Sequence, residues 1–218
     1  MQLSVIVPMA PAENIPEPLL ASLAGHGDSV QIILARTDPP SYRPGEPLCE
    51  VRSAPGRGRQ QNAAAAVAKG RWLWFVHADS ALPVSALEQV LAFASGQDAL
   101  GYCRLRFASD GPILASLNAF GANLRSRWLD LPYGDQGLCL PSSWFRRLGG
   151  FRQDLHRGED LDLVVRARRA GLPLRCMGPT LTTSARRYRQ HGWLRTTLQH
   201  QVSAVRLIYQ ARKSQQLP

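Results

Sequence analysis

The chain has 218 residues, of which 44% are hydrophobic, and this composition indicates a globular protein and excludes a largely disordered one. The formal net charge of +10 favours a polyanionic partner such as nucleotide phosphates, an anionic membrane or nucleic acid, although a compositional bias towards arginine explains it equally well. No run approaches the roughly 20 apolar residues that cross a bilayer, and the four cysteines lack CxxC spacing, which argues against a zinc site or a disulfide framework.

Strand-like and helix-like segments alternate through the first half of the chain. The expected strands are Gln2–Pro8, Val30–Ala35, Cys49–Arg52 and Arg71–Val76. The expected helices are Pro16–Ala24, an alanine-rich helix that follows Gly56–Asn62 and ends at Lys69-Gly70, and Val84–Ala94. This alternation predicts an α/β fold with a mostly parallel central sheet and helices on both faces. No basic segment precedes the first strand, so we expect no signal peptide and a cytoplasmic protein.

The second half is less regular, and we expect residues 1–218 to form a single domain. The expected strands are Leu100–Phe107, which alternates like an antiparallel strand, Gly137–Leu140 and Leu172–Met177. The expected helices are Ile113–Leu129, Pro141–Leu148, Gly158–Ala170 and an amphipathic helix at about 190–212. This last helix can lie on an anionic membrane surface, form a dimer interface or pack on the domain. Packing is favoured, because amphipathicity is expected of any surface helix.

The most informative feature is the tripeptide His77-Ala78-Asp79, which ends the buried run Arg71–Val76. A carboxylate in that position lies at the carboxyl edge of the sheet, where open α/β sheets bind their ligands. Its oxygens suit Mg²⁺ or Mn²⁺, ions that typically hold substrate phosphates. The alternative is that Asp79, or equally Ser80, caps the helix that begins near Pro83.

The segment Gly56-Arg57-Gly58-Arg59 lies between an expected strand and an expected helix. Glycines let a backbone approach a ligand closely, and a helix start offers free N–H groups to an anion. The spacing matches neither GxGxxG nor the P-loop, which disfavours a standard dinucleotide or Walker site. The alternative is a solvated basic turn.

Three further clusters combine residue types that carry chemistry. Pro132–Gly137 mixes an aromatic ring, a carboxylate and an amide in a loop, which is typical of a ligand-binding loop but also of an ordinary turn. Glu159 and Asp160 open a helix, where one of them can act as a general base or both can simply complement the helix dipole. The segment 186–189 and His191 can clamp a diphosphate and bind a metal, or form a basic surface.

In this order, these features resemble family 2 glycosyltransferases with the GT-A fold. The resemblance rests on Ser4–Pro8, Gly56–Asn62, His77–Asp79 and the pair Glu159-Asp160. It is closest to a bacterial subgroup of transferases associated with radical-SAM and selenoprotein-type clusters. Segments similar to that subgroup are Phe75–Asp79, Asn123–Ser126, Leu131–Gly137 and Thr183–Arg187. The similarity spans nearly the whole chain.

The resemblance implies transfer of a sugar from a nucleotide-diphosphate donor of UDP or GDP type to an acceptor hydroxyl, with inversion and with a divalent metal, Mg²⁺ or Mn²⁺. Asp160 matches the family's catalytic base, with Glu159 as its neighbour and fallback. Asp79 matches the metal-binding position, with His77 and His191 as further metal candidates. Arg186 and Arg187 would bind the diphosphate, and the acceptor candidates are Tyr133, Asp135 and Gln136.

The resemblance also implies a nucleotide site. Its candidates are Pro8, Glu13 and Asn14 around the nucleobase, Arg57, Arg59 and Asn62 at the base or ribose, and His77 and Ala78. The family's second strand usually ends in an aspartate that binds the base, whereas this chain reads Leu34–Asp38, so that Asp38 would substitute from a shifted position. Histidine also replaces the first acidic residue of the family's DXD element.

Three other functions remain open. The two departures just described would suit a non-catalytic sugar-nucleotide-binding protein. A sugar nucleotidyltransferase would need its glycine- and arginine-rich loop directly after the first strand, where Met9–Ala12 stands instead. Nucleic-acid binding has only the net charge in its favour, because no RRM, KH or helix-turn-helix signature is present. The motifs specify neither the sugar, the acceptor nor the oligomeric state, because such specificity lies in pocket shape.

Overall fold

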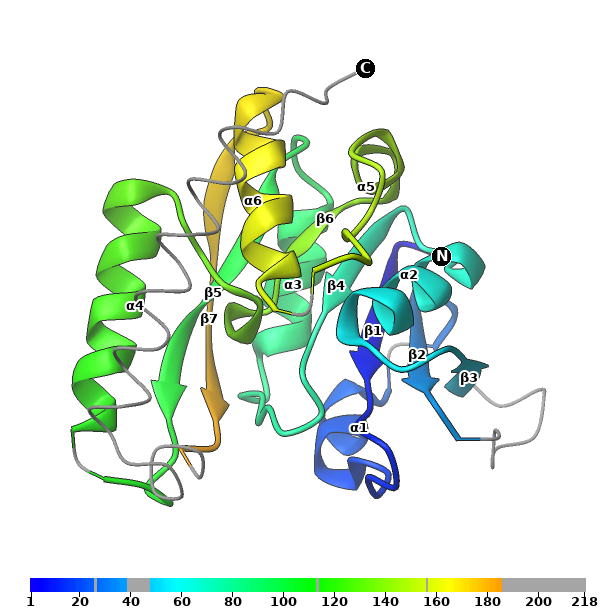
Figure 1. The fold of residues 1–218 in the computed structure, drawn as a ribbon, viewed down its shortest axis with the longest axis horizontal. Coiled ribbons are helices and arrows are strands. Elements are labelled where there is room, and N and C mark those ends of the chain that lie inside the picture. Colours follow the sequence, from blue (N-terminus) through cyan, green and yellow to red (C-terminus); the bar gives the residue numbers. More distant parts are fainter. Residues whose placement is uncertain (26, 39–47, 113, 156, 186–218) are drawn as a thin grey trace.

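The computed structural model describes residues 1–25, 27–38, 48–112, 114–155 and 157–185 (Figure 1). Within them, seven strands form one sheet in the order β3-β2-β1-β4-β6-β5-β7. The strands are β1 Leu3–Pro8, β2 Val30–Arg36, β3 Leu48–Arg52, β4 Trp72–Phe75, β5 Leu100–Phe107, β6 Cys139–Pro141 and β7 Leu174–Thr183. Only the short β6 runs antiparallel to its neighbours, β4 and β5. The sequence prediction of a mostly parallel α/β sheet is therefore confirmed.

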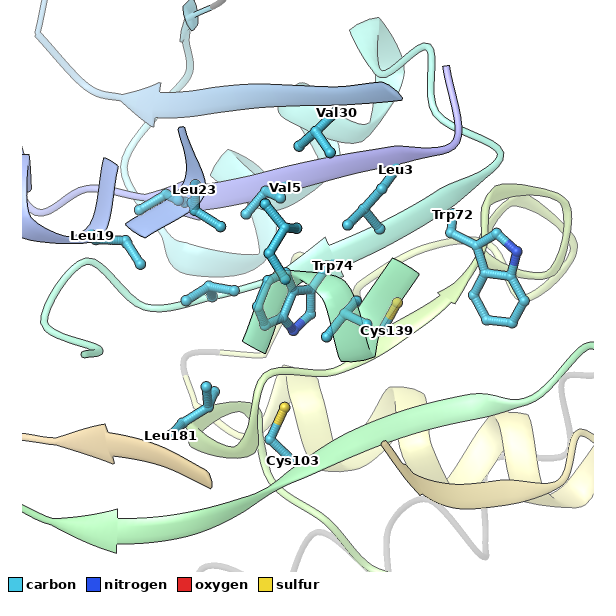
Figure 2. Packing of buried hydrophobic residues seen from close by; sticks show 14 of the residues in the cluster. Leu3, Val5, Leu19, Leu23, Val30, Trp72, Trp74, Cys103, Cys139 and Leu181 are labelled. Carbon is cyan, nitrogen blue, oxygen red and sulfur yellow. The ribbon is translucent and has the colours of Figure 1, made fainter. Parts of the chain in front are cut away.

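Helices cover both faces of this sheet. The helices are α1 Glu17–Leu23, α2 Arg57–Val67, α3 Ala86–Ala94, α4 Ala115–Leu129, α5 Ser142–Arg147 and α6 Glu159–Arg169, with 3₁₀ turns η1 Gly27–Ser29 and η2 Gly134–Gln136. One buried cluster joins α1 and α3 to the sheet, and a second joins α2, α5 and α6 to the opposite face. Figure 2 shows part of the first cluster, in which Leu19 and Leu23 of α1 lie beside Val5.

The alternation of side chains along β1 explains why both faces are packed. Leu3 and Val5 belong to the α1/α3 cluster, whereas Ile6 belongs to the α2/α5/α6 cluster, as a period of two residues requires. The neighbouring β4 behaves in the same way, with Trp74 in the first cluster and Leu73 in the second. A strand buried on both faces reads as a continuous apolar run, which is why β1 and β4 are recognisable from the sequence.

Gln60 fixes α2 against the carboxyl ends of β1 and β2. Its buried amide nitrogen donates to the carbonyl oxygens of Met9, at 2.6 Å, and Ala35, at 2.9 Å. A buried carbonyl group without a partner would destabilise the fold, and the Gln60 amide satisfies two of them at once. The first turn of α2 is therefore held at the sheet edge where these strands end.

Gly70 lies where the connection from α2 to β4 passes against β1. Its N–H donates to Ser4 Oγ at 2.9 Å, and a Cβ atom added to Gly70 would stand only 2.4 Å from the backbone nitrogen of Ser4. The backbone nitrogen of Ser4 lies inside the sheet, so it cannot move without disturbing strand pairing. The close approach therefore requires glycine.

We expect the Gly70→Ala substitution to lower the free energy of unfolding by about 1–3 kcal/mol, the usual cost of overpacking a well-packed interior. Urea denaturation monitored by circular dichroism would measure the change. Gly121→Ala is the matched control, because a Cβ there meets nothing within 4 Å. Because Gly121 lies inside α4, Gly121→Ala should instead raise the free energy of unfolding by roughly 0.5–1 kcal/mol. Wild-type stability of the Gly70→Ala protein would contradict the packing described here.

The structure differs from the sequence prediction at β7 and at β5. The strand predicted over Leu172–Met177 extends to Thr183, because a bulge at Gly178, with a φ of 105°, lets pairing with β5 resume after the interruption. Leu100–Phe107 is antiparallel only to β6 and runs parallel to β7. The amphipathic helix predicted at about 190–212 lies outside the described residues.

None of the helices in the part of the chain that the structure describes combines the length and the apolar composition needed to cross a membrane.

Candidate active site

The topology gathers the candidate residues along one edge of the sheet. All strands except β6 end at this carboxyl edge, and η2 lies there because it precedes β6. Helices α2 and α6 each run back to the start of a strand, so their first turns lie at the same edge. Figure 1 shows α6 rising from the middle of the view, against the downward direction of the arrowheads of β1, β5 and β7. Five segments that carry candidate residues reach this edge: 8–14, 56–62, 77–79, 133–136 and 159–160.

Asp79 is exposed at the end of the β4 segment and lies next to the end of β7. Thr183 Oγ1 and Asp79 Oδ1 are 3.5 Å apart, and Ala81 pairs with Thr182 in an antiparallel bridge. Helix α3 begins only at Ala86, with Ser85 at its N-cap position and no capping side chain. The alternative that Asp79 caps this helix is therefore wrong, and its carboxylate is directed instead to the carboxyl edge.

A metal ion at this edge would have Asp79 as its protein carboxylate. Among the described residues, no three His, Cys, Asp or Glu side chains come together as a ready-made metal cage. Mg²⁺ is commonly held by one or two carboxylates together with substrate phosphates, and the exposed Asp79 fits that mode. His77, which stands two residues before Asp79 in the chain, is partly buried. His191 lies outside the described residues.

Two carboxylates shape the loop between β1 and α1, where the family resemblance implies a nucleobase pocket. Glu13 Oε2 accepts a hydrogen bond from Ala10 N at 2.7 Å, and Asp38 Oδ2 accepts one from Ala12 N at 2.9 Å. Ala12 has a φ of 55°, a left-handed conformation that costs free energy in a residue other than glycine. Asp38 thus reaches the β1 loop from the end of β2. Pro8 is partly buried and Asn14 is exposed at the same loop.

The first two turns of α2 carry the three further nucleotide candidates, and they differ in what they contact. Arg59 is exposed, and Arg57 Nε lies 3.6 Å from Glu159 Oε1. The Asn62 amide donates to Phe151 O at 2.8 Å and accepts from Phe151 N at 2.9 Å. Both polar groups of Asn62 therefore hold the chain before α6 in place, which leaves the two arginines to meet a ligand.

Asp160 lies against η2. Its Oδ2 accepts a hydrogen bond from Gly134 N at 2.5 Å, and its Oδ1 accepts one from Leu161 N at 2.8 Å. Gln136, in the same turn, has no exposed surface, and its amide bonds Cys103 O and Ser126 Oγ. Gln136 consequently supports the turn from inside, while Tyr133 and Asp135 remain partly exposed.

Burial and mutual repulsion perturb the carboxyl groups of this cluster. The pKa of Asp135 is raised to about 6, chiefly by burial and then by the charge of Asp160, against the opposing charges of Arg125 and Arg57. Asp135 Oδ1 is itself buried and accepts no hydrogen bond within the described part of the chain. Burial, followed by the charge of Asp160, also raises the pKa of Glu159. Perturbed carboxyl groups of this kind are typical of functional sites.

Sequence reasoning missed one prominent member of the cluster, Arg125. Its guanidinium carbon stands 3.5 Å from the centre of the Tyr133 ring, and its Nε donates to Leu131 O. Arg125 therefore orders the loop that carries Tyr133 and Asp135. The signal was available, because Arg125 lies in the segment Asn123–Ser126 that supports the family resemblance but was assigned no role.

Two hollows in the described surface lie at opposite edges of the sheet. The larger, about 690 Å³, is lined by Gln2, Arg71 and Ser95 at the amino edge, where none of the candidate residues lies. The smaller, about 180 Å³, lies between the first turn of α2 and the start of α6. We assign function to the carboxyl edge because ligands of open α/β sheets bind there. Arg186 and Arg187 lie outside the described residues.

No protein-family profile and no curated protein sequence matches the chain. Solved structures with a similar fold include S. aureus TarS 1–349 in complex with UDP-GlcNAc, with a TM-score of 0.64, 16% identity and coverage of 85% of this chain and 59% of that one. They also include the mannosyltransferase PcManGT from Pyrobaculum calidifontis in complex with GDP-Man and Mn²⁺, with a TM-score of 0.58, 18% identity and coverage of 82% and 56%. The chain thus spans less than two thirds of the length of these proteins. The similarity shows that the fold is that of GT-A glycosyltransferases.

Proposed function

We propose that this protein is a glycosyltransferase that moves a sugar from a nucleotide-diphosphate donor to an acceptor hydroxyl. The observation that carries the proposal is the convergence of Asp79, from the end of β4, and Asp160, from the start of α6, at one edge of a GT-A fold. Proteins with this fold bind UDP-GlcNAc, UDP and GDP-Man, which supports a donor of UDP or GDP type.

The donor's nucleoside would bind over the β1–α1 loop, with Pro8, Glu13 and Asp38 beside the base. The Ala12–Asp38 hydrogen bond supports this placement, because it joins the two segments that would form the base pocket. His77 and Ala78 would lie under the ribose and diphosphate. Arg186 and Arg187 are proposed to bind the diphosphate. Thr183, the last residue of β7, lies beside Asp79 at the edge where the diphosphate would bind.

Asp79, with His77 as its neighbour, would hold a divalent ion, Mg²⁺ or Mn²⁺. Such an ion supplies Lewis-acid stabilisation of negative charge on the departing diphosphate. The mannosyltransferase with the same fold contains Mn²⁺. His191 remains a proposed further ligand.

Asp160 would act as general base. Its carboxylate removes the proton from the acceptor hydroxyl while that oxygen forms a bond to the anomeric carbon, and the bond from this carbon to the diphosphate oxygen breaks on the opposite face. The single displacement inverts the configuration. The hydrogen bonds from Gly134 N and Leu161 N hold the carboxylate in place, which is what positioning a base requires. Glu159 is the alternative base.

The acceptor would lie over η2, with Tyr133 and Asp135 as its contacts and Gln136 as their support. Peripheral contact with the inner face of a membrane remains a prediction for residues 190–212. A non-catalytic sugar-nucleotide-binding protein is the second candidate function, because histidine stands at position 77 and Asp38 is used to order the β1 loop.

A thermal-shift panel of UDP, GDP and CDP, each with and without Mn²⁺, tests the proposal. Ligand at about 100 times its Kd stabilises a protein by about 2.7 kcal/mol, which corresponds to a rise in Tm of roughly 5–11 °C for a chain of this size. We expect one nucleotide to produce such a rise, with Mn²⁺ increasing it. Asp79→Asn should remove the Mn²⁺ contribution.

Asp28→Asn is the matched control, because Asp28 is an aspartate at the opposite edge of the sheet. It should keep the full response. A rise in Tm with nucleotide but no transfer from its sugar conjugate would favour the binding-protein alternative, and no rise with any nucleotide would contradict both functions.

A further inference from the structure

The smaller hollow at the carboxyl edge lies beside the proposed catalytic base rather than over the donor loop. One wall is formed by Gly56 and the first turn of α2, which begins at Arg57. The other wall is formed by Arg152, Gln153, Leu155 and Glu159. Its volume is about 180 Å³, which suits a single small chemical group rather than a whole nucleotide sugar. Its position and lining are therefore distinct from those of the β1–α1 loop.

Three arginines line this hollow, and they are neutralised to different extents. Arg59 is exposed and forms no ion pair with the described residues. Within the described residues, Arg57 forms one ion-pair contact, at 3.6 Å to Glu159. Arg152 binds Asp154 through its Nε and Nη2 and stands 4.0 Å from Asp162. Positive charge is thus least compensated at Arg59 and Arg57, on the α2 side.

The start of α2 adds to this positive potential. The helix has 11 residues, its N-cap residue Gly56 offers no capping side chain, and no acidic residue occupies the first turn. The N–H groups of a first turn are without intrahelical partners and carry the positive end of the helix dipole, so they attract an anion.

Glu159 provides a second, independent indication that a ligand belongs here. Its side chain lines the hollow and is only 5% exposed, yet its Oε1 accepts no hydrogen bond within the described residues. Unsatisfied buried polar atoms are rare in folded proteins because each costs free energy. The charge of this carboxyl group is met by Arg57 Nε at 3.6 Å, which is an ion-pair contact without a hydrogen bond.

Glu159 and Asp160 are consecutive residues with different surroundings. Glu159 contacts Arg57 of α2, whereas Asp160 bonds Gly134 of η2. The hollow is lined by Glu159 and not by Asp160, so a molecule seated in it would reach the proposed base by extending along the start of α6. Because Asp160 takes its proton from the acceptor, that molecule would be the acceptor and not the donor.

We propose that the acceptor carries an anionic group, a phosphate or a carboxylate, which binds in this hollow through Arg59, Arg57 and the first turn of α2 while the reacting hydroxyl meets Asp160. This inference rests on the proposed glycosyltransferase function and names the substrate class for its acceptor side. It assigns Arg57 and Arg59 to the acceptor instead of the nucleotide.

Isothermal titration calorimetry with inorganic phosphate and, separately, malonate tests the inference at constant ionic strength. We expect one or both anions to bind the full chain, and the tighter one identifies the anionic group. Arg59→Gln should weaken that binding about tenfold or more, since a hydrogen bond to a charged group contributes roughly 1.5–3 kcal/mol. Arg71→Gln removes the same charge at the amino edge and should leave binding unchanged.

A titration of the same anion in the presence of saturating UDP or GDP separates the two sites. Binding that is unaffected by the nucleotide supports an acceptor site. Loss of anion binding on nucleotide addition, or weaker nucleotide binding in Arg59→Gln, would place the donor's phosphates in the hollow and overturn the inference. Absence of anion binding by the wild-type chain would also overturn it. Nucleotide affinity is measured independently, so these outcomes are distinct from failure of the proposed glycosyltransferase function.

Discussion

Replacing Asp160 with asparagine should lower kcat by about 10²- to 10⁴-fold, the range that a positioned general base contributes. Nucleotide affinity should stay within about twofold, because Asp160 bonds Gly134 and Leu161 and has no described contact with the β1–α1 loop. The rate to measure is release of nucleoside diphosphate from a sugar conjugate of the nucleotide that the binding panel identifies, with water as the acceptor. A loss confined to kcat would show that Asp160 acts in the chemical step.

Glu159→Gln is the matched control for this substitution. It also removes one carboxylate from the start of α6, but Glu159 lies against Arg57 and not against η2. We expect its kcat to fall by less than about tenfold, because it is not the proton acceptor in this mechanism. An equal or larger loss in Glu159→Gln would make Glu159 the base. The melting temperature of each variant separates lost chemistry from lost folding.

Replacing Asp135 with asparagine should stabilise the protein at neutral pH. In the folded protein the pKa of Asp135 is about 6, against its usual 3.8, so the folded state holds the proton more tightly than the unfolded chain. Stability is therefore lost as the pH rises from 3.8 to 6, and the full cost is present above pH 6. A shift of about two pKa units corresponds to roughly 3 kcal/mol, which is the upper bound for the gain in Asp135→Asn.

Urea denaturation at pH 4 and at pH 7.5 measures this effect. The variant should match the wild type at pH 4, where Asp135 is largely protonated, and exceed it by about 1–3 kcal/mol at pH 7.5. Asp154→Asn is a control with the opposite expected effect on stability. The hydrogen bond from Arg152 lowers the pKa of Asp154, so the ionised carboxylate stabilises the fold and its removal should destabilise the protein. A less stable Asp135→Asn protein at pH 7.5 would contradict the account.

The same substitution should reduce transfer to the acceptor. A carboxylate that destabilises the fold persists in a natural protein when function uses it, and Asp135 lies beside Asp160 at the ligand edge. Gain of stability together with loss of activity would thus place Asp135 in the acceptor site.

The sequence was informative wherever chemistry follows directly from a local pattern. Asp79 follows a run that is apolar because β4 is buried on both faces, so its place at the carboxyl edge could be predicted. Glu159 and Asp160 are the first two residues of a helix with clear amphipathic periodicity, and α6 begins within one residue of the prediction. In both cases the position depends only on neighbours in the chain.

Side-chain roles set by distant partners could not be predicted. Gln136 and Asn62 read as polar groups of exposed segments, but Gln136 bonds Cys103, 33 residues away, and Asn62 bonds Phe151, 89 residues away. The pairing of β7 beyond Gly178 depends in the same way on β5. The Arg125–Tyr133 stack likewise requires α4 to pack beside the η2 loop, which periodicity alone does not specify.

The central claim is that a nucleotide diphosphate binds with a metal at the carboxyl edge, and NMR relaxation by Mn²⁺ tests it most directly. With UDP or GDP present, Mn²⁺ should broaden the amide signals of Asp79 and Thr183, which lie side by side at that edge. The amides of Gln2 and Ser95, at the amino edge, should stay sharp. Nucleotide-dependent broadening centred on Gln2 and Ser95, or none at all, would contradict the account.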